Sequence, residues 1–429
     1  MRFILILITN LLLIFNVSAE ENFKFYLEKA IKNNLQLNAE RKNLGVAQQD
    51  KVISRSEFLP SLTISGDQTS TTSTNRKNKS GSSLPDFNSD SENRSITLEQ
   101  KIFSGFKGVN TFKKSELETQ KAKLELNKVE QQTILDAASA YFDLIFKIKN
   151  EKFNVLNVNL FERQVESDSA RLQKGEITLT DLAQSESSLA GAKANLIKAK
   201  TELISSKTNF ERVIREKPPE SKKFNEKIFL KLPESLNLSL KLSNLQNIDL
   251  LISKLEYEIA VKELDIERAR LSPSASIEVS KSEDRDFSSS IDKKNDETVK
   301  AKITWPIIKG GENISQIKKS SLKKQRALLI LQDTNSEIST KTSNAWSRYQ
   351  SLKSVLEATR KQLTAAEIAN EGISLEYDSG NNRTTLEVIQ SRSLLLDARI
   401  AFAKAERDFV IAKFELAKQL GTLSFQLIN

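Results

Sequence analysis

The residues that could do chemistry in this chain lie at two similar bends, about two hundred residues apart. The stretches KGEITLTDLAQ and SGNNRTTLEVIQ each contain a glycine, Gly175 or Gly380, followed by threonine and then by an acid, Asp181 or Glu387. Each glycine is placed to end one helix, and the acid then lies in the first turn of the next helix, where the helix dipole favours negative charge. The same bend is therefore expected twice.

Catalysis is not expected at these bends or elsewhere. The chain contains no histidine and no cysteine, which removes the usual general base and the usual zinc and thiol chemistry. It has no glycine-rich loop that could cradle a phosphate. We therefore predict that the protein is not an enzyme and uses no cofactor or metal. The net charge of +9 comes from lysine and arginine interleaved with acids, which favours solvated helix faces over a nucleic-acid partner.

The first 19 residues are predicted to be a signal peptide. Arg2 is followed by an apolar run from Phe3 to Phe15 and by small residues ending at Ala19, which is the pattern of a secretory signal. An uncleaved membrane anchor is the alternative, but the run is shorter than the ~20 residues that a spanning helix needs. The absence of cysteine argues against a lipoprotein.

The bends are connected by long helices and short strand pairs. In residues 20–215, a helix should end before Pro60, and strands are expected at about 61–72 and 95–104, with a slip in the alternation near Ile102 and a polar loop between them. A helix from about Val109 to Gly175 follows, and then a second from about Leu179 to Arg215. The first carries a packing seam with a seven-residue repeat: Ile134, Tyr141, Ile148 and Val155.

Residues 242–429 repeat this plan. A helix should end before Pro273, strands are expected at about 274–282 and 298–306 with a polar loop between them, and a helix of about seventy residues reaches Gly380. Gly105 and Gly175 are seventy residues apart, and so are Gly310 and Gly380. Residues 216–241 are expected to link the halves, and a small lateral appendage is left open for this segment. The fold class is mainly α, with two tandem repeats of long coiled-coil-like helices plus β-hairpins.

The four strands alternate apolar and polar residues imperfectly, which is typical of a membrane β-barrel. Four strands cannot close a barrel, since small barrels use about eight, and open edges in a bilayer leave backbone groups unpaired. Several copies would therefore have to share one barrel. Trp305, Phe103 and Phe106 would form an aromatic girdle at its periplasmic interface. Strand-end packing in a soluble domain is the alternative.

The sequence resembles the TolC family of outer-membrane efflux and type I secretion channels. The similarity covers the mature chain and is carried by the two proline junctions, the strand exits IFSG and IIKGG, the two bends, and LGTL near the end. It implies a homotrimer in the outer membrane of a Gram-negative bacterium, with a shared 12-strand β-barrel and an α-helical barrel that extends into the periplasm. It also implies a passive exit duct that works with a periplasmic adaptor (membrane fusion) protein and an inner-membrane pump of the ABC or RND type.

The resemblance also implies a gate at the bends. Tyr377 and Arg383 match closing residues of the family, and Glu387 matches the first acid of its constriction. Gln390 stands where a second acid is expected, so one acidic ring would be missing. Asp181 matches the acid of the first bend. Three Glu387 carboxylates in a narrow neck would attract cations and raise one another's pKa.

Alternatives remain open for these roles. Arg383 could hold the tip closed by reaching Asp181 or a backbone carbonyl, whereas Asp181 could simply stabilise a helix start. Glu387 could lie on a solvated outer face, and one extra residue in the second bend leaves the register of Arg383 open by one position. For the whole protein, a periplasmic adaptor or another coiled-coil scaffold is the main alternative, and a trimeric surface fibre is a further one.

Overall fold

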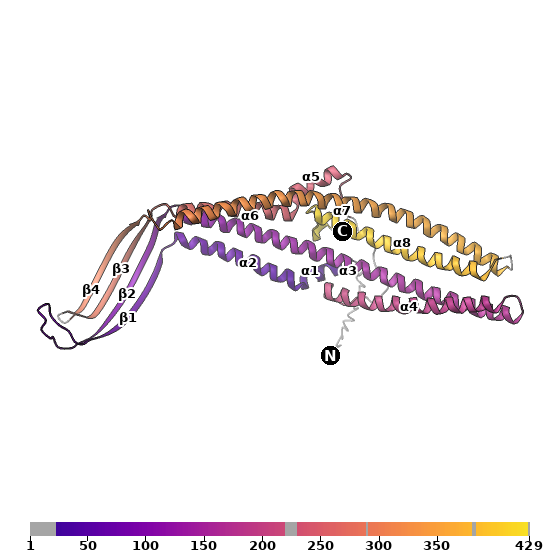
Figure 1. The fold of residues 1–429 in the computed structure, drawn as a ribbon, viewed down its shortest axis with the longest axis horizontal. Helices are drawn as coiled ribbons and strands as arrows, with labels where there is room; N and C mark the ends of the chain where they lie inside the picture. The colour runs from indigo at the N-terminus through magenta and orange to yellow at the C-terminus, as the bar shows by residue number, and fades with distance from the viewer. Residues whose placement is uncertain (1–22, 219–229, 289–290, 380–382, 428–429) are drawn as a thin grey trace, which may run out of the picture. The chain divides into compact units, whose positions relative to one another are not determined.

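The computed structural model describes residues 23–218, 230–288, 291–379 and 383–427. The predicted signal peptide and Gly380 lie outside these residues. The described chain is dominated by helices, with one antiparallel sheet (Figure 1). Its elements are α1 (Phe23–Asn33), α2 (Leu35–Arg55), η1 (Ser56–Phe58), β1 (Ser61–Ser73), β2 (Phe87–Ser104), α3 (Lys107–Gln173), α4 (Leu179–Ile214), α5 (Leu236–Gln246), α6 (Ile248–Ala269), β3 (Ser274–Ser288), β4 (Ile291–Thr304), α7 (Glu312–Asp378), α8 (Thr385–Gln419) and η2 (Phe425–Leu427).

The chain divides into two compact units. The first comprises Met1–Asn38, Glu130–Ser243 and Lys341–Asn429, and the second comprises Ala39–Val129 and Asn244–Thr340. The long helices α3 and α7 contribute to both units, because each continues without a break for 67 residues, or about 100 Å at 1.5 Å per residue. Both are therefore as long as the spacing of the glycines predicts. No helix of the described chain is both long and apolar enough to cross a membrane.

The helices that lead to Pro60 and Pro273 differ from the prediction, because each is interrupted by an asparagine. Asn34 separates α1 from α2, and Asn247 separates α5 from α6. In each case the asparagine side-chain oxygen accepts a hydrogen bond from a backbone N–H three residues later, at 2.9 Å for Leu37 and 3.1 Å for Leu250. The side chain thus caps a new helix, which allows the chain to change direction. The repeat extends to this detail, and α5 begins inside the segment expected to be a linker.

The second unit contains the sheet, in the order β1-β2-β3-β4 with every pair antiparallel. Pro60 and Pro273 directly precede β1 and β3, as predicted. A bulge between Lys101 and Phe103 accounts for the slip in the sequence pattern. The observed β2, β3 and β4 are longer than predicted; they replace part of the first expected polar loop and most of the second. Trp305 lies just beyond the end of β4.

Charged side chains explain the extra length of these strands. They pair with one another across neighbouring strands, as Lys293 does with Glu283 at 3.1 Å and Arg285 does with the facing Glu92 at 4.0 Å. Opposite charges at facing positions support strand pairing. A prediction from local polarity takes no account of these cross-strand partners, so it assigns the residues to loops.

The two faces of the sheet differ in polarity. The strand register aligns Leu62, Leu98, Val279 and Val299 in one row across the four strands. The adjacent row contains hydroxyl-bearing side chains only and faces the other way; it consists of Thr63, Thr97, Ser280 and Thr298. The outer edges of β1 and β4 have no strand partner within the described chain.

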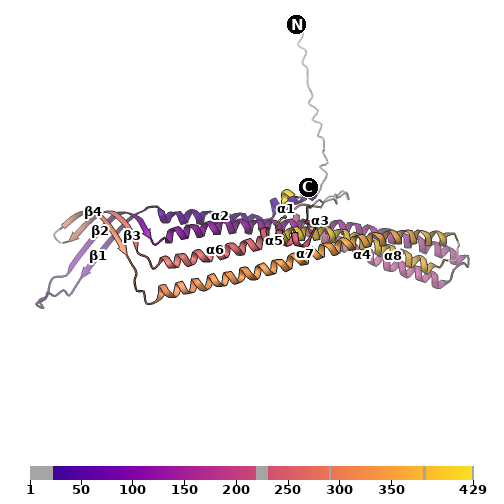
Figure 2. The same cartoon turned by 90° about the horizontal axis from the view of Figure 1, so that it is seen from above.

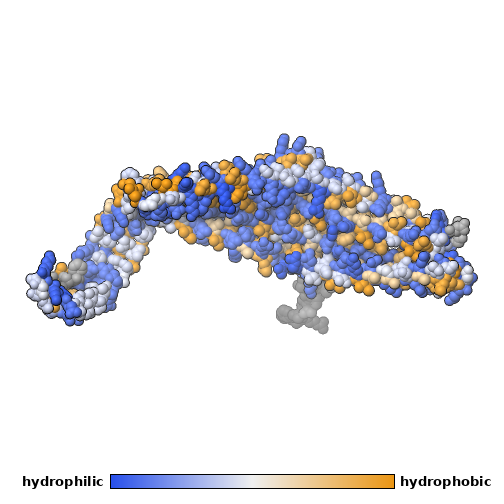
Figure 3. Space-filling view, viewed as in Figure 1, coloured by the Kyte–Doolittle hydropathy of each residue, from blue (hydrophilic) through white to orange (hydrophobic). Residues whose placement is uncertain are grey.

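Helices continue from the sheet in the order α2, α3, α6 and α7 within the second unit (Figure 2). Side-chain contacts join each neighbouring pair: Ser54 to Ser115, Lys121 to Glu256, and Lys323 to Glu263. The helices form a single layer, so many apolar side chains remain exposed. Figure 3 shows this mixture of hydrophobic and hydrophilic surface.

The first unit has the main hydrophobic core, which surrounds the α3 seam. Ile134 and Tyr141 of the predicted seam are fully buried, and Ile148 and Val155 are half-buried. The two buried residues belong to a core with an aromatic cluster from four helices: Phe23 and Tyr26 of α1, Tyr141 and Phe142 of α3, Phe210 of α4 and Phe414 of α8. This core holds the hairpins of the two repeats together.

Candidate functional site

The two predicted bends are helical hairpin tips built by the same device. Gly175 has φ of 74°, a left-handed conformation that glycine adopts without strain, and it follows the end of α3. The next helix begins at a capping box, in which Thr178 accepts from the Asp181 N–H and the Asp181 carboxylate accepts from the Thr178 N–H at 2.9 Å. At the second tip, Thr384 and Glu387 make the same reciprocal bonds.

Asp181 is therefore engaged at the start of α4. Its carboxylate also accepts from the Thr178 hydroxyl at 2.7 Å, and these bonds lower the pKa of Asp181. Its position fits the alternative of a helix-capping acid. Within the described chain, Arg383 contacts other acids instead of Asp181.

Arg383 lies between two glutamates of its own hairpin. Its Nε donates to Glu376 Oε2 at 2.6 Å, and one terminal nitrogen donates to Glu387 Oε1 at 2.9 Å. The hydrogen bond from the Thr384 backbone N–H lowers the pKa of Glu387 most, and the hydrogen bond from Arg383 lowers it further. This is opposite to the rise expected from neighbouring copies, because a single chain surrounds the carboxylate with donors. Gln390 is exposed on α8 and belongs to none of these contacts.

Tyr377 is the buried member of the predicted set, with 6% of its surface exposed. Its hydroxyl donates to Asp168 Oδ1 at 2.8 Å and lies 3.1 Å from the Thr385 hydroxyl. Burial raises the pKa of Tyr377, so the phenol remains protonated and able to donate. The Arg171 guanidinium covers the ring, 4.6 Å from its centroid.

Asp168 is the residue that sequence reasoning missed. It is fully buried, and its carboxylate also accepts from Gln164 Nε2 at 2.9 Å and from the Ser185 hydroxyl at 2.5 Å. The bonds join α3, α4 and α7, and Tyr377 extends them to Thr385 of α8. The available signal was spacing: Asp168 follows the buried Phe161 by seven residues and so lies on the same stripe of α3.

A second bridge between the repeats lies next to this cluster. Arg392 of α8 donates to the backbone carbonyl of Leu160 on α3 at 3.3 Å. Burial lowers the pKa of Arg392, while the charges of Asp378 and Asp168 oppose that shift. The tips of both hairpins are thus joined by a buried polar cluster and carry exposed charges at their ends.

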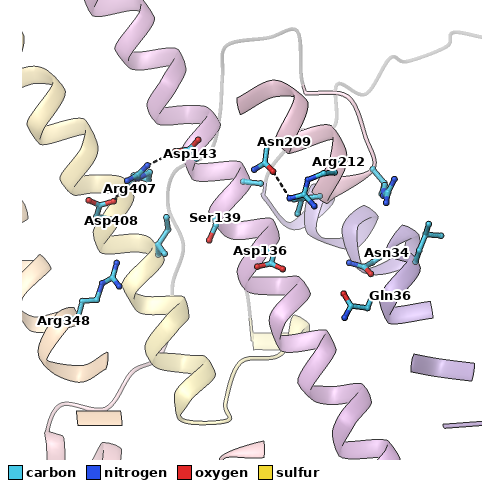
Figure 4. Close-up of a pocket in the computed structure, with 15 residues that line it drawn as sticks. Asn34, Gln36, Asp136, Ser139, Asp143, Asn209, Arg212, Arg348, Arg407 and Asp408 are labelled. Atoms are coloured by element: carbon cyan, nitrogen blue, oxygen red, sulfur yellow. Dashed lines mark hydrogen bonds and ion pairs between the residues drawn. The ribbon is translucent and has the colours of Figure 1, made fainter. Parts of the chain in front are cut away.

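Elsewhere in the first unit, a cavity of about 710 Å³ is lined mainly by polar side chains (Figure 4). Arg407 lies at its wall and pairs with Asp143 at 2.7 Å and Asp408 at 2.6 Å. These charges compensate one another. Among the described residues, no group of acids is arranged to hold a metal ion.

Comparison with known proteins identifies the family of this chain. The model of a family described as outer membrane efflux protein matches residues 26–214 and 240–422. The outer membrane efflux protein BepC of Brucella suis is 25% identical, over 98% of this chain and 89% of its own length. The outer membrane protein TolC of Escherichia coli is 22% identical, over 96% of this chain and 84% of its own length.

Solved structures share the fold. CusC superposes with a TM-score of 0.81 at 16% identity, covering 94% of this chain and 92% of CusC. The Campylobacter jejuni outer membrane channel CmeC also gives 0.81, at 17% identity, covering 94% of this chain and 86% of CmeC. The tandem-repeat, mainly helical fold class predicted from the sequence is confirmed.

Proposed function

This chain belongs to the outer membrane efflux protein family and is an outer-membrane efflux channel; on that premise we propose that three copies form one passive exit duct, gated at the helical hairpin tips. The three sheets would close a shared 12-strand barrel, and the helices would form a tunnel through the periplasm. The alternative of a periplasmic adaptor is not favoured, because the family match covers both halves of the chain.

The exposed edges of the second unit support assembly from several copies. Strands β1 and β4 leave backbone groups for a neighbouring strand, and a bilayer cannot satisfy these groups. The outermost helices α2 and α7 expose apolar side chains, among them Ile53 at 65% and Leu329 at 65%. Pairing β1 and α2 of one copy with β4 and α7 of the next would cover both edges and close a ring.

The hydrogen bond between Tyr377 and Asp168 is the observation that best supports a gate at the tips. It lies in a buried cluster that joins the hairpin of the first repeat to the hairpin of the second. Opening of the tip would require either that this bond breaks, so that the two hairpins separate, or that both hairpins move as one unit. Arg383, between Glu376 and Glu387, would set the charge at the neck.

The same geometry supports a place for partner proteins. Away from the buried cluster, α4 and α8 expose Leu179, Ile197 and Leu394 at 65–71%. An apolar helix face is a common docking surface for a partner helix. We assign it to the helical hairpin of a periplasmic adaptor, which would connect the duct to an inner-membrane pump of an efflux or type I secretion system.

Single-channel recording in planar bilayers tests the proposal. Purified mature protein should give a small, cation-selective conductance, because closed tips would narrow the duct and Glu387 would place negative charge at its neck. A Tyr377→Phe, Arg383→Ser variant removes the buried hydrogen bonds of the Tyr377 hydroxyl and two exposed ion pairs of Arg383, and its conductance should rise several-fold. The matched control is Tyr349→Phe, Arg360→Ser, which removes the same groups from α7 away from the tip.

The outcomes separate the gate from the channel. If the tip variant conducts like the wild type and like the control, the duct stands but these residues do not close it. If the purified protein forms no trimer and gives no conductance, the proposed function itself is wrong.

A further inference from the structure

Positive charge is concentrated where the chain leaves the sheet. Residues 300–326 contain eight lysine or arginine residues and one glutamate, and residues 101–114 contain four lysines and no acid. Their combined excess of eleven positive charges is larger than the net charge of the whole chain, +9. The remainder of the protein is therefore slightly acidic, and these two strand exits are its basic surface.

The two exits have the same order of side chains. In the first repeat, Lys101 is followed by the exposed Phe103 and Phe106 and then by Lys107. In the second, Lys302 is followed by Trp305, Ile307 and Ile308, which are 61%, 75% and 87% exposed, and then by Lys309. Each exit later carries a lysine pair in the first turns of its helix: Lys113 and Lys114, and Lys318 and Lys319.

The aromatic side chains are held in place. Trp305 Nε1 donates to the backbone carbonyl of Leu271 at 3.0 Å, which fixes the indole although its ring is exposed. Phe103 and Phe106 pack edge to face, with ring centroids 5.6 Å apart. Rings held by a polar or aromatic partner at the end of an apolar sheet face are typical of a membrane–water interface.

Most of the basic side chains are available to a ligand. Lys309, Lys318 and Lys319 are exposed. Among the described residues of the two exits, three lysines make ion pairs: Lys101 with Glu57, Lys114 with Glu118 and Glu263, and Lys323 with Glu263. At 1.5 Å per residue, Lys318 and Lys319 lie about 10 Å along α7 from its start, roughly one Debye length at physiological salt.

We propose that the two strand exits form a basic collar that binds the headgroup phosphates of anionic phospholipids, at the bilayer face from which the helices emerge. The inference rests on the proposed function, because that places the sheet in the membrane. Apolar rings would enter the headgroup boundary, and flexible lysine side chains would extend to the phosphates. Three copies would provide six exits around the duct.

The collar has a mechanical consequence. Apolar rows alone would allow the sheet to move along the membrane normal as long as they stay within the hydrocarbon layer. Aromatic rings and lysines that all lie at the headgroup boundary would oppose such a movement. Anchoring at the exits would hold the helices at a constant height while a pump engages the tips. The lysines are spread from the strand ends into the first turns of the helices, so they recognise a charged surface rather than one bound molecule.

Tryptophan quenching tests the collar in the assembled protein. A Trp346→Phe background leaves Trp305 as the single tryptophan of the chain. Brominated phosphatidylglycerol should quench it at a lower mole fraction in mixed micelles than brominated phosphatidylcholine does, at low salt. Changing Lys309, Lys318 and Lys319 to Gln should reduce this preference by about tenfold or more. The matched control changes Lys353, Lys361 and Lys404 to Gln and should retain it.

Two further arms identify the ligand. Sodium chloride at about 0.5 M should remove the preference by screening, whereas inorganic phosphate should have only the effect of its ionic strength. Equal quenching by the two lipids, or a preference that survives in the collar variant, would overturn the proposal. The conductance of the same preparations separates this from failure of the channel: a conducting trimer without lipid preference refutes the collar alone.

Discussion

Two kinds of acid serve different purposes at the hairpin tips. Asp181 and Glu387 are surface acids that begin helices and are surrounded by N–H and O–H donors. Asp168 is fully buried and accepts from three side chains of different elements. The surface acids can be changed with local effects, whereas loss of the buried one leaves several donors without an acceptor.

The first prediction concerns Asp168. Changing it to Ala should destabilise the tip by about 1–3 kcal/mol, because Tyr377 and Ser185 lose a buried acceptor. Backbone amides near both tips should then exchange hydrogen for deuterium faster in mass spectrometry. Asp136→Ala is the control, since Asp136 lies on the exposed side of the same helix. Unchanged exchange at the second tip would show that Asp168 does not join the hairpins.

A second prediction concerns pH. The donors around Glu387 lower its pKa below the ordinary 4.5, so their stabilising effect is present above that value and is lost as the pH falls through the lowered pKa. Cation selectivity that depends on Glu387 should fade over the same range. Arg383→Ser removes one of these donors, so the midpoint should move to higher pH. Reversal potentials under a salt gradient measure it; an identical midpoint in both proteins would contradict the assignment.

At the scale of elements, glycine sets the turns, but not equally in the two repeats. Gly105 and Gly310 occupy matching exits and both have positive φ, at 61° and 55°. A Cβ on Gly105 would lie 2.5 Å from the Ser272 Cβ and 2.6 Å from the Ala269 carbonyl oxygen, whereas one on Gly310 would meet nothing within 4 Å. The first exit is packed against the second repeat, and the other is open.

The third prediction follows from this difference. Gly310→Ala should lower the free energy of unfolding by only about 1–2 kcal/mol, the strain of placing an alanine in the left-handed conformation. Gly105→Ala adds a collision with backbone, and its cost should exceed about 3 kcal/mol. Thermal unfolding of the purified proteins in detergent should rank wild type, Gly310→Ala and Gly105→Ala in that order. Equal losses would mean that the packing at Gly105 relaxes freely.

These elements also mark where sequence reasoning succeeds. The long helices, proline junctions and glycine bends are predictable, because each depends on local periodicity or on one backbone preference. The breaks at Asn34 and Asn247 depend on a side chain turning back to cap a helix. The extra strand length depends on cross-strand partners such as Glu283 and Lys293. The spacing of Asp168 places it on a stripe of α3, but its bonding partners are brought together only when two hairpins distant in sequence meet around it.

For the whole molecule, the sheet separates two environments. The row containing Leu98 and Val279 is apolar, and the next row, with Thr97 and Ser280, bears hydroxyl groups. In a barrel shared by three copies, the apolar face would contact lipid and the hydroxyl face would line water. Every substitution in the sheet is then present three times, so small costs per chain become large for assembly.

The last prediction compares neighbouring positions on central strand β3. Val279→Arg would place a charge on the lipid-facing side, at about 2–4 kcal/mol per chain near the bilayer midplane. Ser280→Arg adds the same side chain one residue later, on the water-lined face, and should leave assembly nearly intact. The measurement is the fraction of trimer recovered from outer membranes on semi-native gels. Comparable losses for the two variants would contradict the assignment of faces, and a greater loss for Ser280→Arg would place the hydroxyl row against lipid.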